Sequence, residues 1–397
     1  MPQNASDPPD KAVRLSEHTG TRAGRGFQDD FLDDLRDDFQ DDGQWEPERL
    51  PTSGWRKVVL SGAALAVVGG VGTWAAVSDP PEPAAEPVRS AAPAGTPRQT
   101  VVPPSAESPP SRITVEEARR VHDRYTRDLS IAQATRNARA MGGLEQGLAL
   151  EMSRASFETA RMRGEKPASG LWPEPELLVP RDAGGTTGWF AAVSYQKGVA
   201  RISEVLTATP DGWRATAFTA DTRTPPAPLP GVATDSGGYA TSLPENASGL
   251  LATPRQVARA HLASLESATP DPRFADGPWT GRAVRFWQQE RARLERAGWR
   301  LTLSFRPEGP VRSLMTDDGG ALIWYGARST DLRQARRAGA KVALKGSAAV
   351  RTDGKAFART ASATYGRIYV AHVPPAGSSE RVRVLGEWSE VLESHGT

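Results

Sequence analysis

The sequence predicts an α+β protein, in which a single transmembrane helix precedes exported tandem units of helices packed on curved antiparallel sheets. Three observations support this fold class: an uncharged apolar run at 58–77, helical periodicity that begins at Thr114, and strand-like runs that follow each helical region. Helices and strands therefore occur in separate blocks, which is typical of α+β folds.

The apolar run at 58–77 has the length of a membrane span. At about 1.5 Å per residue, a helix of this length covers about 30 Å, the thickness of the hydrocarbon core of a bilayer. Arg56 and Lys57 precede the run and Asp79 follows it, so the positive-inside rule predicts a cytosolic N-terminus and extracytoplasmic C-terminal domains in a single-pass protein of the cell membrane. The alternatives are a buried core helix, which would normally carry a polar face, and a cleaved signal peptide, which seldom follows so long an N-terminal segment.

Three small residues recur at every fourth position of this predicted helix. Gly62, Ala66 and Gly70 would lie on one face, where a second helix could approach closely. A homodimer through this face is one interpretation. The other is that Gly and Ala are simply frequent in transmembrane helices.

Residues 1–55 are predicted to form a disordered cytosolic segment, because they carry too little apolar surface to offset the entropy of ordering. Within it, an acidic repeat at 27–42 spaces four apolar side chains at intervals of four with Asp pairs between them: Phe27, Phe31, Leu35 and Phe39. A helix would gather these four on one face. A cytosolic partner with a basic groove would bury that face and neutralise the aspartates; alternatively, the segment is a solubilising tail.

A linker rich in Pro, Ala and Ser at 78–112 separates the predicted membrane helix from two predicted α+β domains, 113–225 and 250–397. The first domain opens with a capping box, Thr114 and Glu117, ahead of a long amphipathic helix. Thr253 opens a similar run, which suggests a tandem arrangement. Pro210, Asp211 and Gly212 predict a hairpin between two strands.

Three phrases carry a resemblance to a known family: LPGVATDSGGYA at 229–240, LMTDDGGALIWYG at 314–326 and YVAHVPPAGSSERVRVLGEW at 369–388. In this order, they resemble an actinobacterial family of membrane-anchored or secreted proteins of unknown function, over roughly residues 113–395. The resemblance implies a location in the cell envelope and no established active-site residues. The order of helices and strands is also similar to that of NTF2-like and cystatin-like folds.

Cysteine is absent, which excludes disulfides, thiolate nucleophiles and Cys-ligated metals. The loop Thr234–Gly238 resembles the nucleophile loop of trypsin-like proteases, but no histidine stands in that family's pattern, so a glycine-rich turn is the better interpretation. No metal-binding or nucleotide-binding spacing occurs, so no catalytic residue, no cofactor and no nucleic-acid partner is expected. Most tryptophans of the exported region are expected in the core, and one or two could line a pocket: Trp172, Trp189, Trp213, Trp279, Trp287, Trp299, Trp324 and Trp388.

The sequence therefore predicts a non-enzymatic envelope protein whose exported domains bind a cell-wall or protein partner. Two alternatives remain open. One is an exported enzyme or small-ligand binder that uses a pocket under a curved sheet, for which convergent buried polar side chains would be the evidence. The other is a scaffold of a membrane secretion or conjugal-transfer complex.

Overall fold

The computed structural model describes residues 113–167, 174–181, 188–196, 200–223 and 225–397. The predicted cytosolic segment 1–55, the predicted membrane helix 58–77 and the linker 78–112 lie outside these residues. Among the described residues, no helix is both long enough and apolar enough to cross a membrane.

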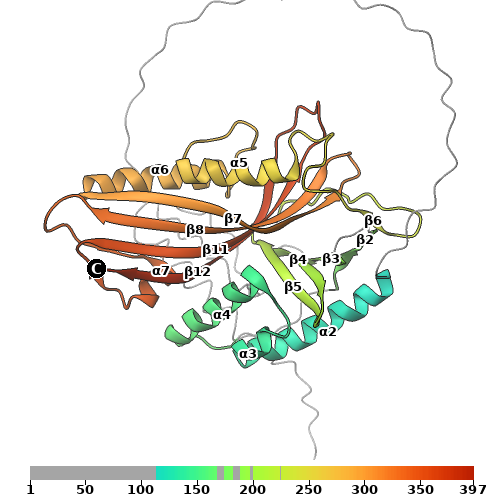
Figure 1. Cartoon of the computed structure of the whole chain (residues 1–397), viewed down its shortest axis with the longest axis horizontal. Helices are drawn as coiled ribbons and strands as arrows, with labels where there is room; N and C mark the ends of the chain where they lie inside the picture. The colour runs from blue at the N-terminus through green and yellow to red at the C-terminus, as the bar shows by residue number, and fades with distance from the viewer. Residues whose placement is uncertain (1–112, 168–173, 182–187, 197–199, 224) are drawn as a thin grey trace, which may run out of the picture.

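One antiparallel sheet, curled into a half-barrel, is the centre of the fold (Figure 1). Its eight strands lie in the order β1-β3-β4-β5-β12-β11-β8-β7. Their bounds, in this order, are Glu176–Leu178, Trp189–Gln196, Ala200–Thr209, Gly212–Asp221, Arg383–Gly396, Thr360–Val373, Ala321–Ala335 and Trp299–Met315. Two short pairs accompany the sheet: β2 (Pro180–Arg181) with β6 (Ala240–Thr241), and β9 (Val342–Ala343) with β10 (Ala356–Phe357).

The predicted α+β class with antiparallel pairing is confirmed, but the expectation of separate sheets is wrong. Strands from 113–225 and from 250–397 join in one sheet, where β5 meets β12 through the pair Ala220 and Glu387. The junction shortens the exposed edges of both sets of strands, although Ala220 and Glu387 form the one residue pair recorded between β5 and β12 in the described part of the chain. Hydrophobic alternation identifies strands but does not specify which strand lies beside which.

Curling brings β4 and β8 into contact, although β5, β12 and β11 separate them in the sheet. Trp324 Nε1 of β8 donates a hydrogen bond to Ser203 Oγ of β4 at 3.0 Å. Trp189 packs edge-on against Trp324, with ring centroids 6.4 Å apart. These buried contacts fill the inside of the curve and explain why the strands bend rather than form a flat layer.

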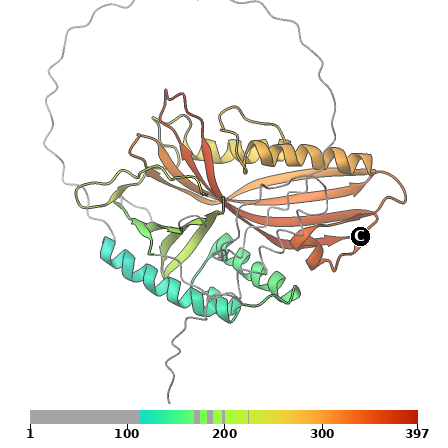
Figure 2. The ribbon, with the colours of Figure 1, turned by 180° about the vertical axis from the view of Figure 1, so that it is seen from behind.

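Two groups of helices cover the sheet (Figures 1 and 2). Helices α5 (Pro254–Ser267) and α6 (Gly281–Arg296) lie along the long strands β7 and β8, where they enclose the largest hydrophobic core. Helix α2 (Val115–Ala134) covers β3, β4 and β5, and the short α3 (Ala138–Met141) leads into α4 (Gly147–Met162), which packs on β5 and β12. Helix α7 (Gly346–Arg351) lies beside β12 and α4.

Both predicted helix starts are confirmed. Thr114 and Glu117 form a reciprocal capping box at α2, and Thr253 and Gln256 form another at α5. The predicted hairpin is also confirmed, because β4 and β5 pair across the turn from Thr209 to Gly212.

A glycine in β11 allows α4 to lie close to the sheet. A Cβ atom added at Gly366 would lie 2.5 Å from Cγ of Met152, which is fully buried on α4. This close approach fixes the distance between α4 and the sheet, and therefore the depth of the space beside it.

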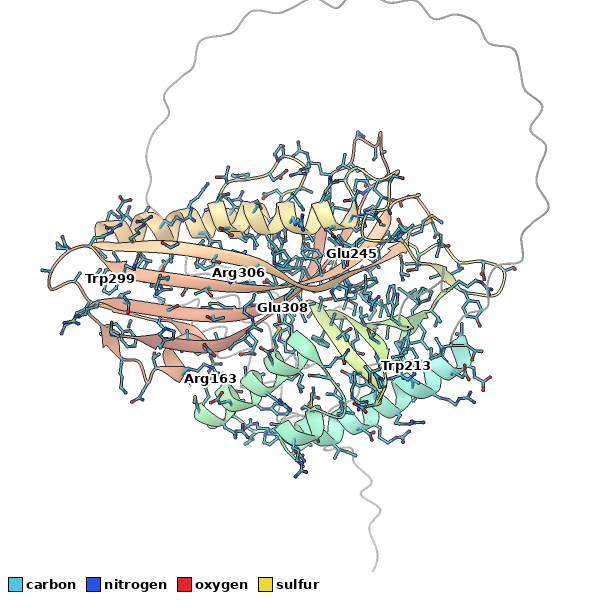
Figure 3. The ribbon with its side chains drawn as sticks, viewed as in Figure 1. Arg163, Trp213, Glu245, Trp299, Arg306 and Glu308 are labelled. Carbon is cyan, nitrogen blue, oxygen red and sulfur yellow. The ribbon has the colours of Figure 1, made fainter. Side chains whose placement is uncertain are left out.

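The edge strand β7 is protected by two glutamates. Glu266 Oε2 accepts a hydrogen bond from Phe305 N at 3.0 Å, and Glu245 Oε1 accepts one from Val311 N at 3.0 Å. Glu245 is labelled beside this strand in Figure 3. Side chains that occupy outward-facing N–H groups in this way discourage another strand from pairing with the edge.

Candidate functional site

Polar side chains converge in a pocket between α2, α4 and the strands β5 and β12. In Figure 3, Arg163 and Trp213 mark either side of this region. The cavity volume is about 70 Å³, and the open space reaches about 660 Å³ when the solvent-filled mouth is included. Since one water molecule needs about 10–15 Å³ of cavity volume, the interior has room for a few waters or a ligand of few heavy atoms.

The lining comes from four elements and three connecting segments. It comprises Tyr125, Leu129 and Gln133 of α2, Arg136 and Glu145 near α3, Ser153, Ser156, Phe157 and Ala160 of α4, Glu165 and Lys166 after α4, Phe218 of β5 and Trp388 of β12.

Glu145 is the acidic group of the pocket interior. The segment that carries it pairs with β5, since Ala215 N donates to Leu144 O at 2.8 Å and Gln146 N donates to Ala215 O at 3.0 Å. This pairing holds Glu145 between the helices and the sheet, where the residue is only 6% exposed.

The environment of Glu145 favours its neutral form. Burial raises the pKa of Glu145 to about 8, a hydrogen bond from Ser153 acts in the opposite direction, and the nearby charge of Glu204 raises the pKa further. The carboxyl is therefore mostly protonated at pH 7. Its Oε2 atom has no hydrogen-bond partner among the described residues.

A buried histidine and glutamate adjoin this acid. His122 Nε2 of α2 lies 3.1 Å from Glu204 Oε2 of β4, and both side chains are about 5% exposed. Burial, with the charges of Glu204 and Glu145, raises the pKa of Tyr125 well above its usual value, so this phenol keeps its proton. The pocket interior therefore presents two protonated groups, the Glu145 carboxyl and the Tyr125 phenol. Both lie near Glu204, which is already paired with His122.

Aromatic rings form the remaining wall. Trp388 and Phe218 pack edge-to-face with centroids 5.5 Å apart and an interplanar angle of 82°, and Phe157 lines the same space. Trp388 is 5% exposed, yet its Nε1 has no hydrogen-bond partner within the described part of the chain. Buried tryptophan N–H groups normally have a partner, so this donor is a second group that a ligand could satisfy.

A second buried acid lies behind α4. Burial raises the pKa of Glu390 to about 7, while Arg351, the Val391 amide and Arg163 act in the opposite direction, together with a hydrogen bond from Ser156 of the pocket lining. Arg351 donates to Ala155 O of α4 at 2.9 Å. The interior of this half of the protein therefore holds two carboxyl groups that titrate near neutral pH.

Two other buried polar clusters are satisfied within the fold, whereas further buried atoms outside the pocket lining, such as His122 Nδ1 and Trp299 Nε1, have no hydrogen-bond partner among the described residues. Arg367 Nη1 contacts Glu387 Oε1 at 2.7 Å on the face of the sheet opposite Trp388. His261 Nε2 donates to Trp279 O at 2.7 Å, its Nδ1 accepts from the Tyr325 hydroxyl at 2.9 Å, and burial lowers the pKa of His261 to about 4. These two clusters stabilise the core and leave no atom free for a ligand.

The residues singled out from sequence have different outcomes. The predicted partner-binding set Phe27, Phe31, Leu35 and Phe39 and the predicted helix-association set Gly62, Ala66 and Gly70 lie outside the described residues and stay predictions. The loop Thr234–Gly238 is an exposed turn in which Asp235 Oδ1 accepts from Gly237 N at 2.8 Å. No group of three or more histidines and acids that could hold a metal occurs in the described ranges.

Of the eight tryptophans considered, Trp388 lines the pocket and Trp172 lies outside the described residues. The others, half-buried or buried, pack in the core: Trp189, Trp213, Trp279, Trp287, Trp299 and Trp324. Glu145 was missed, because it stands in a short connection with no periodic pattern. An isolated acid between Leu144 and Leu148 was the only signal that could have drawn attention to it.

The fold and the pocket together define an α+β protein with a half-barrel sheet and a helix-covered polar pocket. A family model described as "Domain of unknown function (DUF8094)" matches residues 111–396, and the chain belongs to this family. No curated protein and no solved structure matches the chain.

Proposed function

We propose that this protein is a single-pass envelope protein whose extracytoplasmic domain binds a small ligand in the pocket between α2 and α4. The observation that carries the proposal is the presence of two unpartnered buried polar atoms, Glu145 Oε2 and Trp388 Nε1, on the walls of one pocket. Leaving such groups unsatisfied costs about 1–3 kcal/mol each. A ligand that supplies both partners would recover that cost.

Binding is favoured over catalysis because the pocket lacks an activated nucleophile. His122 Nε2 contacts Glu204 and its Nδ1 has no hydrogen-bond partner among the described residues, but His122 is not part of the pocket lining. The pocket serines Ser153 and Ser156 are hydrogen-bonded to the buried carboxyls Glu145 and Glu390. A nucleophilic serine would need an adjacent free base instead.

The membrane location rests on the apolar run at 58–77 and its basic flank. The acidic repeat at 27–42 would then face the cytosol, where we propose that it docks on a basic protein partner. In this arrangement one chain would carry a ligand-binding domain outside and a docking segment inside.

Filling the pocket tests the proposal. Ala160 of α4 lines the pocket, so Ala160→Phe would occupy it, whereas Ala134→Phe at the exposed end of α2 is a matched control. Thermal unfolding of the full chain would be measured against a panel of small polar metabolites. A compound that raises the Tm of the wild type and of Ala134→Phe, but not of Ala160→Phe, is the expected result.

A second outcome would refute ligand binding in this pocket. If no compound raises the Tm and Ala160→Phe alone is more stable than the wild type, the pocket is a packing void and the proposal fails.

A further inference from the structure

The two unpartnered atoms of the pocket have complementary hydrogen-bonding characters. Trp388 Nε1 can only donate, whereas the Glu145 carboxyl accepts once it has lost its proton. Both side chains are more than nine-tenths buried and both line the same space. A single ligand that presents an oxygen acceptor to Trp388 Nε1 and an N–H donor to the ionised Glu145 carboxyl would satisfy both atoms.

The interior of the pocket holds acidic side chains, and its mouth holds basic ones. The interior holds Glu145, with Glu204 close behind it. The mouth carries Arg136 and Lys166, which are partly or fully exposed, whereas the carboxylate of Glu165 at the same mouth is paired with Arg163 at 3.3 Å. An entering molecule thus meets positive charge first and acidic groups at depth.

We infer that the pocket binds the zwitterion of a small amino acid, with its ammonium group against Glu145 and its carboxylate against Trp388 Nε1 and the cationic mouth. This inference rests on the proposed function and names its ligand class. On binding, the Glu145 carboxyl transfers its proton to solvent and becomes the carboxylate that accepts from the ammonium group. Tyr125, Phe157 and Phe218 line the same space, where aromatic rings stabilise a positive charge.

Simpler ligands match the pocket less well. A monoanion could accept hydrogen bonds from Trp388 Nε1 and from the protonated Glu145 carboxyl, but it would bring a second negative charge close to Glu204, whereas a zwitterion also brings a positive charge to this end of the pocket. A monocation would have to pass Arg136 and Lys166 and would leave the Trp388 N–H without an acceptor. The cavity volume of about 70 Å³ limits the part enclosed to a few heavy atoms, which is the size of an amino acid's charged core and a short side chain.

Three related probes separate these cases. L-alanine carries both charges, propionate lacks the ammonium group and ethylamine lacks the carboxylate. Calorimetric titration of the full chain at pH 7 is expected to show binding of L-alanine at least tenfold tighter than of either control. Repeating the titration in buffers of different ionisation enthalpy is expected to show the release of close to one proton per L-alanine bound.

Three variants test which residues of the pocket contact the bound amino acid. Glu145→Gln keeps the side-chain shape but cannot ionise, so it is expected to weaken L-alanine binding at least tenfold and to abolish proton release. Lys166→Gln changes an exposed side chain, and it should weaken binding several-fold without altering proton release. Trp388→Phe keeps an aromatic wall without the N–H and should also weaken binding several-fold.

Other outcomes would overturn either the zwitterion inference or the proposed binding of a small ligand. If propionate or ethylamine binds as tightly as L-alanine, or if Glu145→Gln binds normally, the zwitterion inference is wrong while small-ligand binding stands. If none of the three probes binds, the inference fails. The proposed function then fails only if the metabolite panel with Ala160→Phe is negative as well.

Discussion

Replacing Glu145 by glutamine should make the protein more stable at high pH. The folded protein holds this carboxyl with a pKa of about 8, against 4.5 for the exposed group. Between these values the folded state binds more protons than the unfolded state, so stability falls as pH rises. Glutamine has nearly the same shape and cannot ionise, and it therefore removes this pH dependence.

The magnitude follows from the two pKa values. Linkage gives a loss of about 3.5 kcal/mol from Glu145 between pH 5 and pH 8. The wild type and Glu145→Gln should therefore unfold at similar urea concentrations at pH 5. At pH 8 the variant should be more stable by up to about 3.5 kcal/mol, because only the wild type must keep a buried acid protonated or desolvate its charge.

Urea unfolding of the full chain, followed by tryptophan fluorescence at pH 5, 6, 7 and 8, would measure this difference. Glu390→Gln is a second variant for comparison, since the pKa of Glu390 is raised to about 7. Linkage gives a loss of stability of about 2.5 kcal/mol from Glu390 between pH 5 and pH 8. The two effects should add in the double variant. Parallel pH profiles for the wild type and Glu145→Gln would refute the reasoning and would mean that water reaches the carboxyl freely.

Three further predictions concern the fold, the topology and the N-terminal segment. Gly326→Ala should destabilise the protein by about 1–3 kcal/mol in urea unfolding, because the new Cβ would lie 2.7 Å from the backbone oxygen of Glu308. Gly277→Ala is the control, because its new Cβ would lie 3.4 Å from Thr280 Oγ1, an ordinary contact distance. The chain has no cysteine, so a single introduced cysteine reports which side of the membrane it lies on. A membrane-impermeant maleimide should label Ser379→Cys in intact cells and Ser53→Cys only after lysis. The reverse pattern would overturn the proposed orientation, with the N-terminus in the cytosol. A crosslinking pull-down from membranes should capture a cytosolic partner with the unmodified chain but not with one carrying serine at Phe27, Phe31, Leu35 and Phe39; identical captures would leave the acidic segment as a solubilising tail.

Local features of the fold could be predicted because their causes are local. Thr114 and Thr253 each cap a helix through residues three positions away, and the turn before Gly212 lies between two strands that are neighbours in sequence. The sequence did not reveal that β5 and β12 would pair, since they are separated by 161 positions between Asp221 and Arg383. No periodic pattern encodes such a long-range choice.

The candidate site depended on the same long-range pairing. Glu145 and Trp388 lie far apart in the chain, and they meet because β12 pairs beside β5 and α4 packs close to the sheet over Gly366. The order of elements suggests a pocket under a curved sheet as one alternative, but it does not identify the residues of such a pocket, since burial and the absence of a hydrogen-bond partner are properties of the folded chain.

The sequence by itself determined the composition limits, the absence of thiol chemistry, the helix starts and the α+β class, because these follow from residue type and short-range spacing. Tertiary structure alone decided that one sheet serves both halves of the region and that an acid and an indole share a pocket. The pKa of Glu145 illustrates the reason: an isolated glutamate titrates as an ordinary acid, and only the surroundings that the fold assembles raise its pKa to about 8.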